Sequence, residues 1–123
     1  MAEERVRILL VEDESLIAEL IVDILTTQGY LVAGPIARIA DAMRTVDEEE
    51  FDAVVLDVDL AGTSSYPVAA VLASRNVPFV FLTGFGKGGL RAEYAKRPTV
   101  AKPFRPKDLL VALSRVLEPQ AIE

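Results

Sequence analysis

The stretch FDAVVLDVDLAGT, residues 51–63, carries an apolar run that ends in two aspartates one residue apart. The centre of its first half is continuously apolar, which is typical of a strand buried on both faces of a parallel sheet. Asp57 and Asp59 therefore stand at the end of a buried strand. Carboxylates in such a place cost folding free energy unless they are paired or bind a cation. The pair is thus a candidate for chemistry.

The segments on either side of this strand alternate between strand and helix patterns. Further strands are predicted at 6–11, 30–34, 77–83 and 99–102, and helices at 14–29, 36–50, 65–75, 84–96 and 105–117. The helix at 84–96 is the weakest, because glycines crowd its start. In the first helix one apolar stripe comprises Leu16, Ile17, Leu20, Ile21, Ile24 and Leu25. Strict alternation with short connections predicts a parallel sheet covered by helices on both faces.

Composition limits the possible functions. The 123 residues suit one domain with a real core, and 51% of them are hydrophobic. A net charge of -6 leaves no basic excess for a nucleic-acid groove. The chain has no cysteine and no histidine, which removes thiol chemistry, histidine general bases and histidine metal ligands. It shows neither a signal peptide nor an apolar run of membrane-spanning length, so we expect a cytoplasmic protein.

Polar residues that can do chemistry follow the predicted strands where each one ends. They are Glu12, Asp13, Asp57, Asp59, Thr83 and Lys102. Each taken singly has an ordinary explanation as a helix cap, a turn residue or a solvated charge. Because the carboxyl ends of parallel strands meet at one edge of the sheet, we expect these side chains to converge. Their joint occurrence there predicts a functional site.

The chemistry of this set indicates phosphoryl transfer. Crowded carboxylates raise one another's pKa unless a cation neutralises them. Mg²⁺ is the hard ion usually held by a few carboxylates together with phosphate oxygens. With a lysine and a threonine, it can compensate the charge of a transferring phosphoryl group. An aspartate can then act as the nucleophile and become an aspartyl phosphate.

Four motifs carry a family resemblance. ILLVEDE (8–14), VVLDVDL (54–60), VFLTGFG (80–86) and VAKPF (100–104) together resemble the receiver domain of two-component response regulators, over essentially the whole chain. FLTGFGKGG (81–89) is similar to a stand-alone alphaproteobacterial subgroup with a Phe-x-Thr-Gly-aromatic motif. The resemblance implies an α/β, flavodoxin-like (βα)5 three-layer sandwich with a five-stranded parallel sheet in the order 2-1-3-4-5. We expect one receiver domain over 1–123, with no output domain.

The resemblance also implies roles for the residues around the metal. Asp57 matches the phosphoacceptor at the end of the third strand. Glu12 and Asp13 match the acidic pair that binds Mg²⁺ directly or through water. Asp59 matches the position whose backbone carbonyl completes the metal site, and its side chain faces the approach of the hydrolytic water.

The remaining motif positions concern the phosphoryl group and the switch. Thr83 matches the hydroxyl that hydrogen-bonds the phosphoryl group, and Lys102 matches the lysine that pairs with it. Pro103 resembles the cis-proline that usually follows. Thr99 departs from the family, because most receivers have an aromatic residue there as a phosphorylation switch. We therefore expect residues 84–92 to be the bistable element instead.

Partners follow from the same resemblance. Since the chain has no histidine, the expected donor is the phosphohistidine of a sensor histidine kinase or a histidine phosphotransfer protein, or else a small acyl phosphate. Apart from self-catalysed phosphorylation and dephosphorylation of the aspartate, no enzyme activity is expected. Neither nucleic acid nor membrane is an expected partner, and the chain should be a monomer or a weak homodimer.

Two other interpretations remain open at this point. In a haloacid-dehalogenase-type phosphatase, an Asp-x-Asp motif followed by threonine supplies a nucleophile and a general acid, and DVDLAGT (57–63) resembles it. That family has the motif on its first strand, however, and Glu12 and Asp13 would be unexplained. The other is a flavodoxin-like binding module, in which GFGKGG (84–89) cradles a phosphate. Such a module would carry no phosphoryl group on Asp57.

Overall fold

Five apolar segments pair into one parallel sheet at the centre of the protein, whose computed structural model describes residues 5–84 and 90–118. The strands are β1 (Arg7–Val11), β2 (Leu31–Ile36), β3 (Ala53–Asp57), β6 (Phe79–Thr83) and β7 (Thr99–Ala101). They lie in the order β2-β1-β3-β6-β7. Counted along the chain this is 2-1-3-4-5, so the predicted flavodoxin-like sheet is confirmed.

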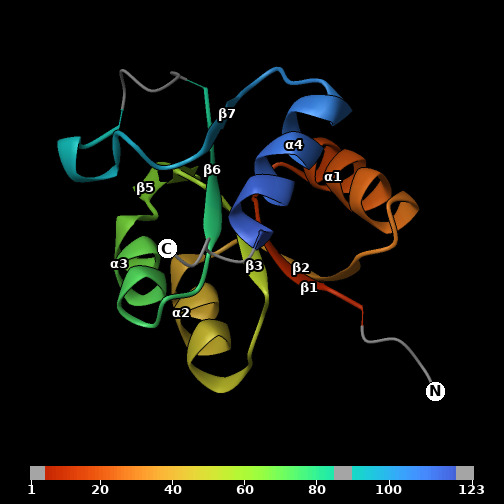
Figure 1. Ribbon diagram of the computed structural model, residues 1–123. Coiled ribbons are helices and arrows are strands. Elements are labelled where there is room, and N and C mark those ends of the chain that lie inside the picture. Colours follow the sequence, from red (N-terminus) through yellow and green to blue (C-terminus); the bar gives the residue numbers. More distant parts are fainter. Residues whose placement is uncertain (1–4, 85–89, 119–123) are drawn as a thin grey trace, which may run out of the picture.

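Helices cover both faces of the sheet (Figure 1). Side chains alternate between the faces along each strand, so every central strand contributes to two apolar clusters. One cluster joins the sheet to α1 (Ser15–Thr27) and α4 (Pro106–Leu117). The other joins it to α2 (Ile39–Glu48) and α3 (Tyr66–Ser74). These two clusters make the three layers that the sequence predicts.

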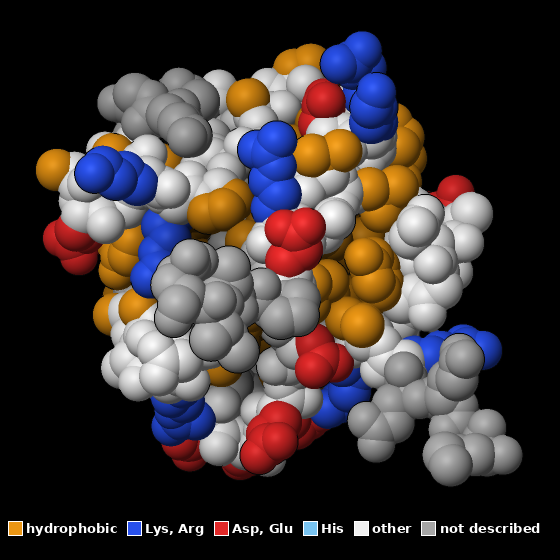
Figure 2. All heavy atoms as spheres, in the orientation of Figure 1, with side chains coloured by type: hydrophobic (Ala, Val, Ile, Leu, Met, Phe, Trp, Pro, Cys, Tyr) orange, Lys and Arg blue, Asp and Glu red, His pale blue; other side chains and the backbone are white. Residues whose placement is uncertain are grey.

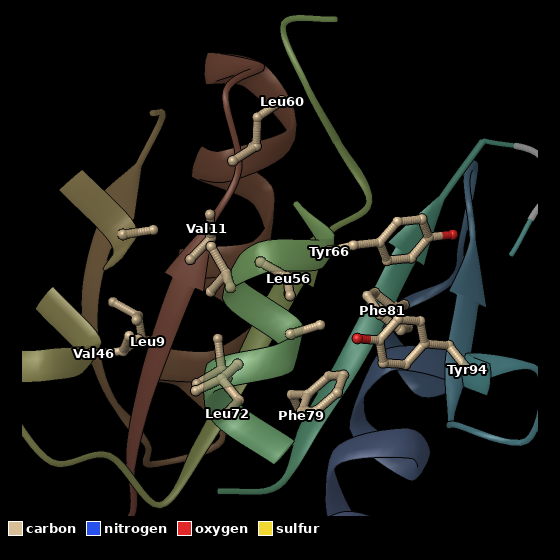
Figure 3. Close-up of a cluster of buried hydrophobic side chains, with 14 residues drawn as sticks. Leu9, Val11, Val46, Leu56, Leu60, Tyr66, Leu72, Phe79, Phe81 and Tyr94 are labelled. Atoms are coloured by element: carbon tan, nitrogen blue, oxygen red, sulfur yellow. The ribbon is translucent and has the colours of Figure 1, made fainter. Parts of the chain in front are cut away.

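The predicted helix at 84–96 is wrong in its described part. Residues 90–96 contain only a 3₁₀ turn, Ala92–Tyr94, while 85–89 lie outside the described residues. This turn is held by aromatic packing rather than by a helical stripe. The ring of Tyr94 stacks on Tyr66 at 5.1 Å between centroids and meets Phe81 edge-on at 5.4 Å (Figure 3). The buried ring of Tyr94 thus provides the packing contact with the core that an amphipathic helix would otherwise provide.

The boundary between β2 and α2 also differs from the prediction. The strand continues to Ile36, whose carbonyl accepts a hydrogen bond from the backbone N–H of Glu12 at 2.9 Å, and α2 begins only at Ile39. Gly34 and Pro35 are joined by a cis peptide bond. Gly34 has φ +98°, and a Cβ there would lie 2.5 Å from the carbonyl oxygen of Leu10. This close approach, which requires glycine, lets the strand run on to residue 36.

A short hairpin follows the central strand, and the sequence did not predict it. Its strands are β4 (Asp59–Leu60) and β5 (Thr63–Ser64), which pair antiparallel. Ala61 and Gly62 form the turn with φ +50° and +87°. Positive φ at both central residues matches the twist of a two-residue hairpin. The hairpin begins two residues after Asp57 and therefore borders the edge where the functional residues are expected.

The apolar stripe predicted on the first helix is wider than the face that packs on the sheet. Ile21 and Leu25 are fully buried, whereas Leu16 is 80% exposed and Leu20 is 46% exposed. Within 5–84 and 90–118, no helix is both long enough and apolar enough to cross a membrane. Leu16 and Leu20 thus lie on the solvent-facing surface of α1, outside the face that packs on the sheet.

Replacing Gly34 by alanine should destabilise the fold by about 2 kcal/mol or more, because strain at positive φ adds to a clash with backbone. Urea unfolding followed by circular dichroism measures this change. Gly29→Ala is the matched control, since Gly29 has φ +100° but nothing within 4 Å of its added Cβ. The control should lose only about 1 kcal/mol. Equal losses in the two variants would contradict the close approach at Leu10.

Candidate functional site

The strand ends bring the predicted residues to one edge of the sheet. Asp57 is the last residue of β3 and Thr83 the last of β6. Glu12 directly follows β1, and Lys102 directly follows β7. Three of these four side chains, those of Glu12, Asp57 and Lys102, are in direct contact. A parallel register accounts for this, because it aligns the ends of neighbouring strands.

Asp57 is the centre of the contacts. The residue is only 4% exposed. Its Oδ1 accepts a hydrogen bond from the backbone N–H of Asp59 at 3.1 Å, and its Oδ2 accepts one from Lys102 Nζ at 2.8 Å. Both oxygens of this buried carboxylate thereby have a hydrogen-bond partner, as buried polar groups require.

Glu12 is the most deeply buried acid of the site, at 1% exposure. Its Oε2 accepts a hydrogen bond from the backbone N–H of Glu14 at 3.0 Å, and its Oε1 lies 2.9 Å from Lys102 Nζ. Burial raises the pKa of Glu12 to about 7, and the nearby carboxylate of Asp57 acts in the same direction. Glu12 is thus an acid whose charge is costly unless a cation is close by.

Lys102 supplies the positive charge in this cluster. Burial by itself would lower its pKa, but the hydrogen bonds to Asp57 and Glu12 outweigh that effect and raise the pKa above the ordinary value. The side chain is 14% exposed. It is therefore a firmly charged ammonium, reachable from solvent, between two buried carboxylates.

The acidic residues fit a hard cation. Glu12, Asp13 and Asp57 each offer a carboxylate oxygen, and these oxygens lie within 4.8 Å of one another. Oε1 of Glu12 is buried and makes no hydrogen bond of good geometry, although it is close to Lys102. A set of two or three carboxylates that still leaves room for water and phosphate oxygens is what Mg²⁺ prefers.

The other predicted residues lie around this cluster. Thr83 is 2% exposed, and its backbone carbonyl accepts a hydrogen bond from the N–H of Lys102 at 2.8 Å. Asp59 has an exposed side chain and contributes its N–H to Asp57. The bond between Lys102 and Pro103 is cis, as predicted. Phe85, in the aromatic motif, lies outside the described residues.

Sequence reasoning missed one participant, Glu14. Its Oε1 accepts a hydrogen bond from Lys102 Nζ at 3.1 Å. The only sequence signal was a third acidic residue next to Glu12 and Asp13. Spacing alone gives no reason to expect that its side chain turns to a lysine 88 positions away.

Comparison with known proteins agrees with this geometry. Residues 8–114 match the response regulator receiver domain. The chain belongs to this family. It is 30% identical over 116 residues to the uncharacterized transcriptional regulatory protein YbdJ of Bacillus subtilis, which covers 91% of this chain and 51% of YbdJ. The receiver domain thus spans about half the length of that relative.

Solved receiver domains have the same fold. SdrG from Sphingomonas melonis Fr1 superposes with a TM-score of 0.84 at 36% identity, over 95% of this chain and 100% of SdrG. The receiver domain of the sensor histidine kinase PA1611 from Pseudomonas aeruginosa superposes with a TM-score of 0.79 at 27% identity. The match covers 93% of this chain and 98% of the PA1611 domain. That structure has a magnesium ion coordinated in its active-site cleft.

These findings decide between the interpretations left open by the sequence. The receiver family is a family of signalling domains with a phosphoacceptor role, and Mg²⁺ is the metal that the acidic cluster of this receiver domain fits. The first aspartate of the Asp-x-Asp motif, Asp57, ends the third strand along the chain, and Glu12 lies against it. Neither the phosphatase nor the non-covalent binding module is favoured.

Proposed function

We propose that Asp57 is the residue of this receiver domain that accepts a phosphoryl group from a partner phosphohistidine. One observation carries the proposal: a carboxylate 4% exposed at a strand end lies 2.8 Å from Lys102 and within metal-ligand reach of Glu12 and Asp13. A purely structural aspartate would need the lysine alone. The additional acids raise the electrostatic cost of ionising the cluster, and a divalent cation that also binds phosphoryl oxygens would offset that cost.

Each residue has a distinct task in the proposed reaction. A carboxylate oxygen of Asp57 attacks the phosphorus, the bond from phosphorus to the imidazole nitrogen breaks, and its electron pair stays on the imidazole. Lys102 and the hydroxyl of Thr83 bind the phosphoryl oxygens as their charge is redistributed. Mg²⁺, held by Glu12, Asp13, Asp57 and the backbone carbonyl of Asp59, would supply further charge neutralisation.

The return step is hydrolysis, which restores the carboxylate of Asp57. Water attacks the phosphorus in line, the bond to the Asp57 oxygen breaks, and inorganic phosphate leaves with the carboxylate restored. The exposed side chain of Asp59 lies two residues after the acceptor. We place it beside the path of this water, where it can tune the lifetime of the phosphorylated state.

Intact-mass analysis with Mg²⁺ and acetyl phosphate tests the acceptor. The protein should gain one phosphoryl group, and Asp57→Asn should gain none, because an amide oxygen is a poor nucleophile. Asp59→Asn is the matched control and should still gain one. Chelation with EDTA should slow the reaction by at least tenfold. Phosphorylation of the Asp57→Asn variant to the same extent would contradict the proposal.

The partner proposed here is a sensor histidine kinase or a histidine phosphotransfer protein. The chain has no histidine of its own. Leu16 and Leu20 project into solvent from the first two turns of α1, the helix that follows Glu12 and Asp13. Hydrophobic side chains gather over α1 and α4 on the face seen in Figure 2. An exposed apolar patch beside a reactive group is a natural contact for the protein that presents the phosphohistidine.

Leu16→Ser should therefore separate the two kinds of donor. Transfer from a phosphorylated donor protein should slow by about tenfold, since burying one leucine is worth 1.5–3 kcal/mol at most. Transfer from acetyl phosphate should be unchanged, because the small donor needs no docking surface. Leu31→Ser is the control, because Leu31 is 44% exposed at the start of β2, away from α1 and from the strand ends that carry the site. A loss with acetyl phosphate as large as with the protein donor would contradict docking at Leu16.

A further inference from the structure

Glu14 uses its side chain in an unusual way for its position. It is the N-cap residue of α1, where a short polar side chain usually caps the first backbone N–H groups. Glu14 forms no such capping bond. Its Oε1 instead accepts a hydrogen bond from Lys102 Nζ at 3.1 Å. The residue is therefore committed to the functional site rather than to its own helix.

Three carboxylates crowd the ammonium of Lys102. An ammonium carries three protons and no acceptor. Its Nζ lies 2.8 Å from Asp57 Oδ2, 2.9 Å from Glu12 Oε1 and 3.1 Å from Glu14 Oε1. Asp57 and Glu14 accept hydrogen bonds from Lys102, whereas Glu12 is paired with it by charge alone. A phosphoryl oxygen that approaches Lys102 from the solvent side therefore competes with Glu14, the most exposed of the three carboxylates, for its hydrogen bond.

Glu14 is the carboxylate that can leave at the lowest cost. The side chains of Glu12 and Asp57 are 0% and 6% exposed, whereas that of Glu14 is 58% exposed. A buried carboxylate left without its partner keeps an uncompensated charge, but an exposed one regains water. Glu14 also stands outside the candidate metal cluster of Glu12, Asp13 and Asp57. Among the residues that the structure describes, its side chain has no other hydrogen bond or ion pair.

We propose that Glu14 is a positioning residue that occupies one donor of Lys102 until the phosphoryl group displaces it. This inference rests on the proposed function of Asp57. Before transfer, Glu14 holds the ammonium toward the mouth of the site. During transfer, the incoming phosphoryl oxygen takes over that donor, and Glu14 turns to solvent. The contact therefore opposes phosphorylation, and its removal should speed the reaction.

Two substitutions separate this contact from a simple effect of charge. Glu14→Gln removes the charge and keeps the shape, whereas Glu14→Asp keeps the charge but is one methylene too short to hold Lys102. Aspartate is also a favoured N-cap, so α1 should be unharmed. Glu19→Gln is the control, because it removes one exposed acidic charge one turn further along α1.

The measurements are the initial rate of phosphorylation by acetyl phosphate with Mg²⁺ and the apparent affinity for beryllofluoride, a phosphoryl mimic that binds without group transfer. Glu14→Gln and Glu14→Asp should each raise both quantities by about two- to fivefold, the range expected for one partly exposed ion pair. In both the initial rate and the apparent affinity, Glu19→Gln should equal the wild-type protein. Thermal unfolding of all four proteins checks that the fold is intact.

Each outcome has a definite meaning. A gain in Glu14→Gln with none in Glu14→Asp would overturn the inference, because charge alone would then be responsible. Equal or lower values in both variants would overturn it as well. If the unchanged protein took up neither a phosphoryl group nor beryllofluoride, the proposed function itself would fail, a result distinguishable from equal uptake by all four proteins.

Discussion

The contact between Lys102 and the two buried carboxylates is the interaction on which the site depends. At 2.8 Å from Asp57 and 2.9 Å from Glu12, one ammonium compensates acids that would otherwise be unpaired at the edge of an apolar sheet. Removing one partner of such a buried set typically costs about 3–5 kcal/mol. Even with this contact, burial raises the pKa of Glu12 to about 7, so its charge remains costly. This residual cost is what an incoming cation relieves.

The topology of the sheet makes this contact possible. Lys102 and Asp57 are 45 positions apart, and only the parallel pairing of β3, β6 and β7 brings their strand ends together. The interiors of the three central strands, β1, β3 and β6, are apolar and buried, so they fix the register without polar side chains. The interiors of these strands therefore stabilise the fold, while their carboxyl ends carry the reactive residues. Substitutions at the rim can change the chemistry while the core stays as it is.

Much of this could be predicted from the sequence, and what could not has identifiable causes. The parallel sheet and the meeting of Asp57 with Lys102 follow from apolar runs that end in polar residues, whereas the strand order was implied by the family resemblance. The 3₁₀ turn at Ala92–Tyr94 does not, because it depends on a tyrosine stacking on a residue 28 positions earlier, and stacking leaves no periodic pattern. Glu14 was missed for a similar reason, since its partner is distant in the sequence.

The central claim is that Asp57, and not another acid of the cluster, becomes phosphorylated. Reductive trapping tests it most directly: the protein is incubated with Mg²⁺ and acetyl phosphate, treated with borohydride, and mapped by peptide mass spectrometry. An aspartyl phosphate is reduced to homoserine, so the account predicts homoserine at position 57 alone. Reduction at Asp59, Asp13 or Glu12 with position 57 unmodified would contradict it.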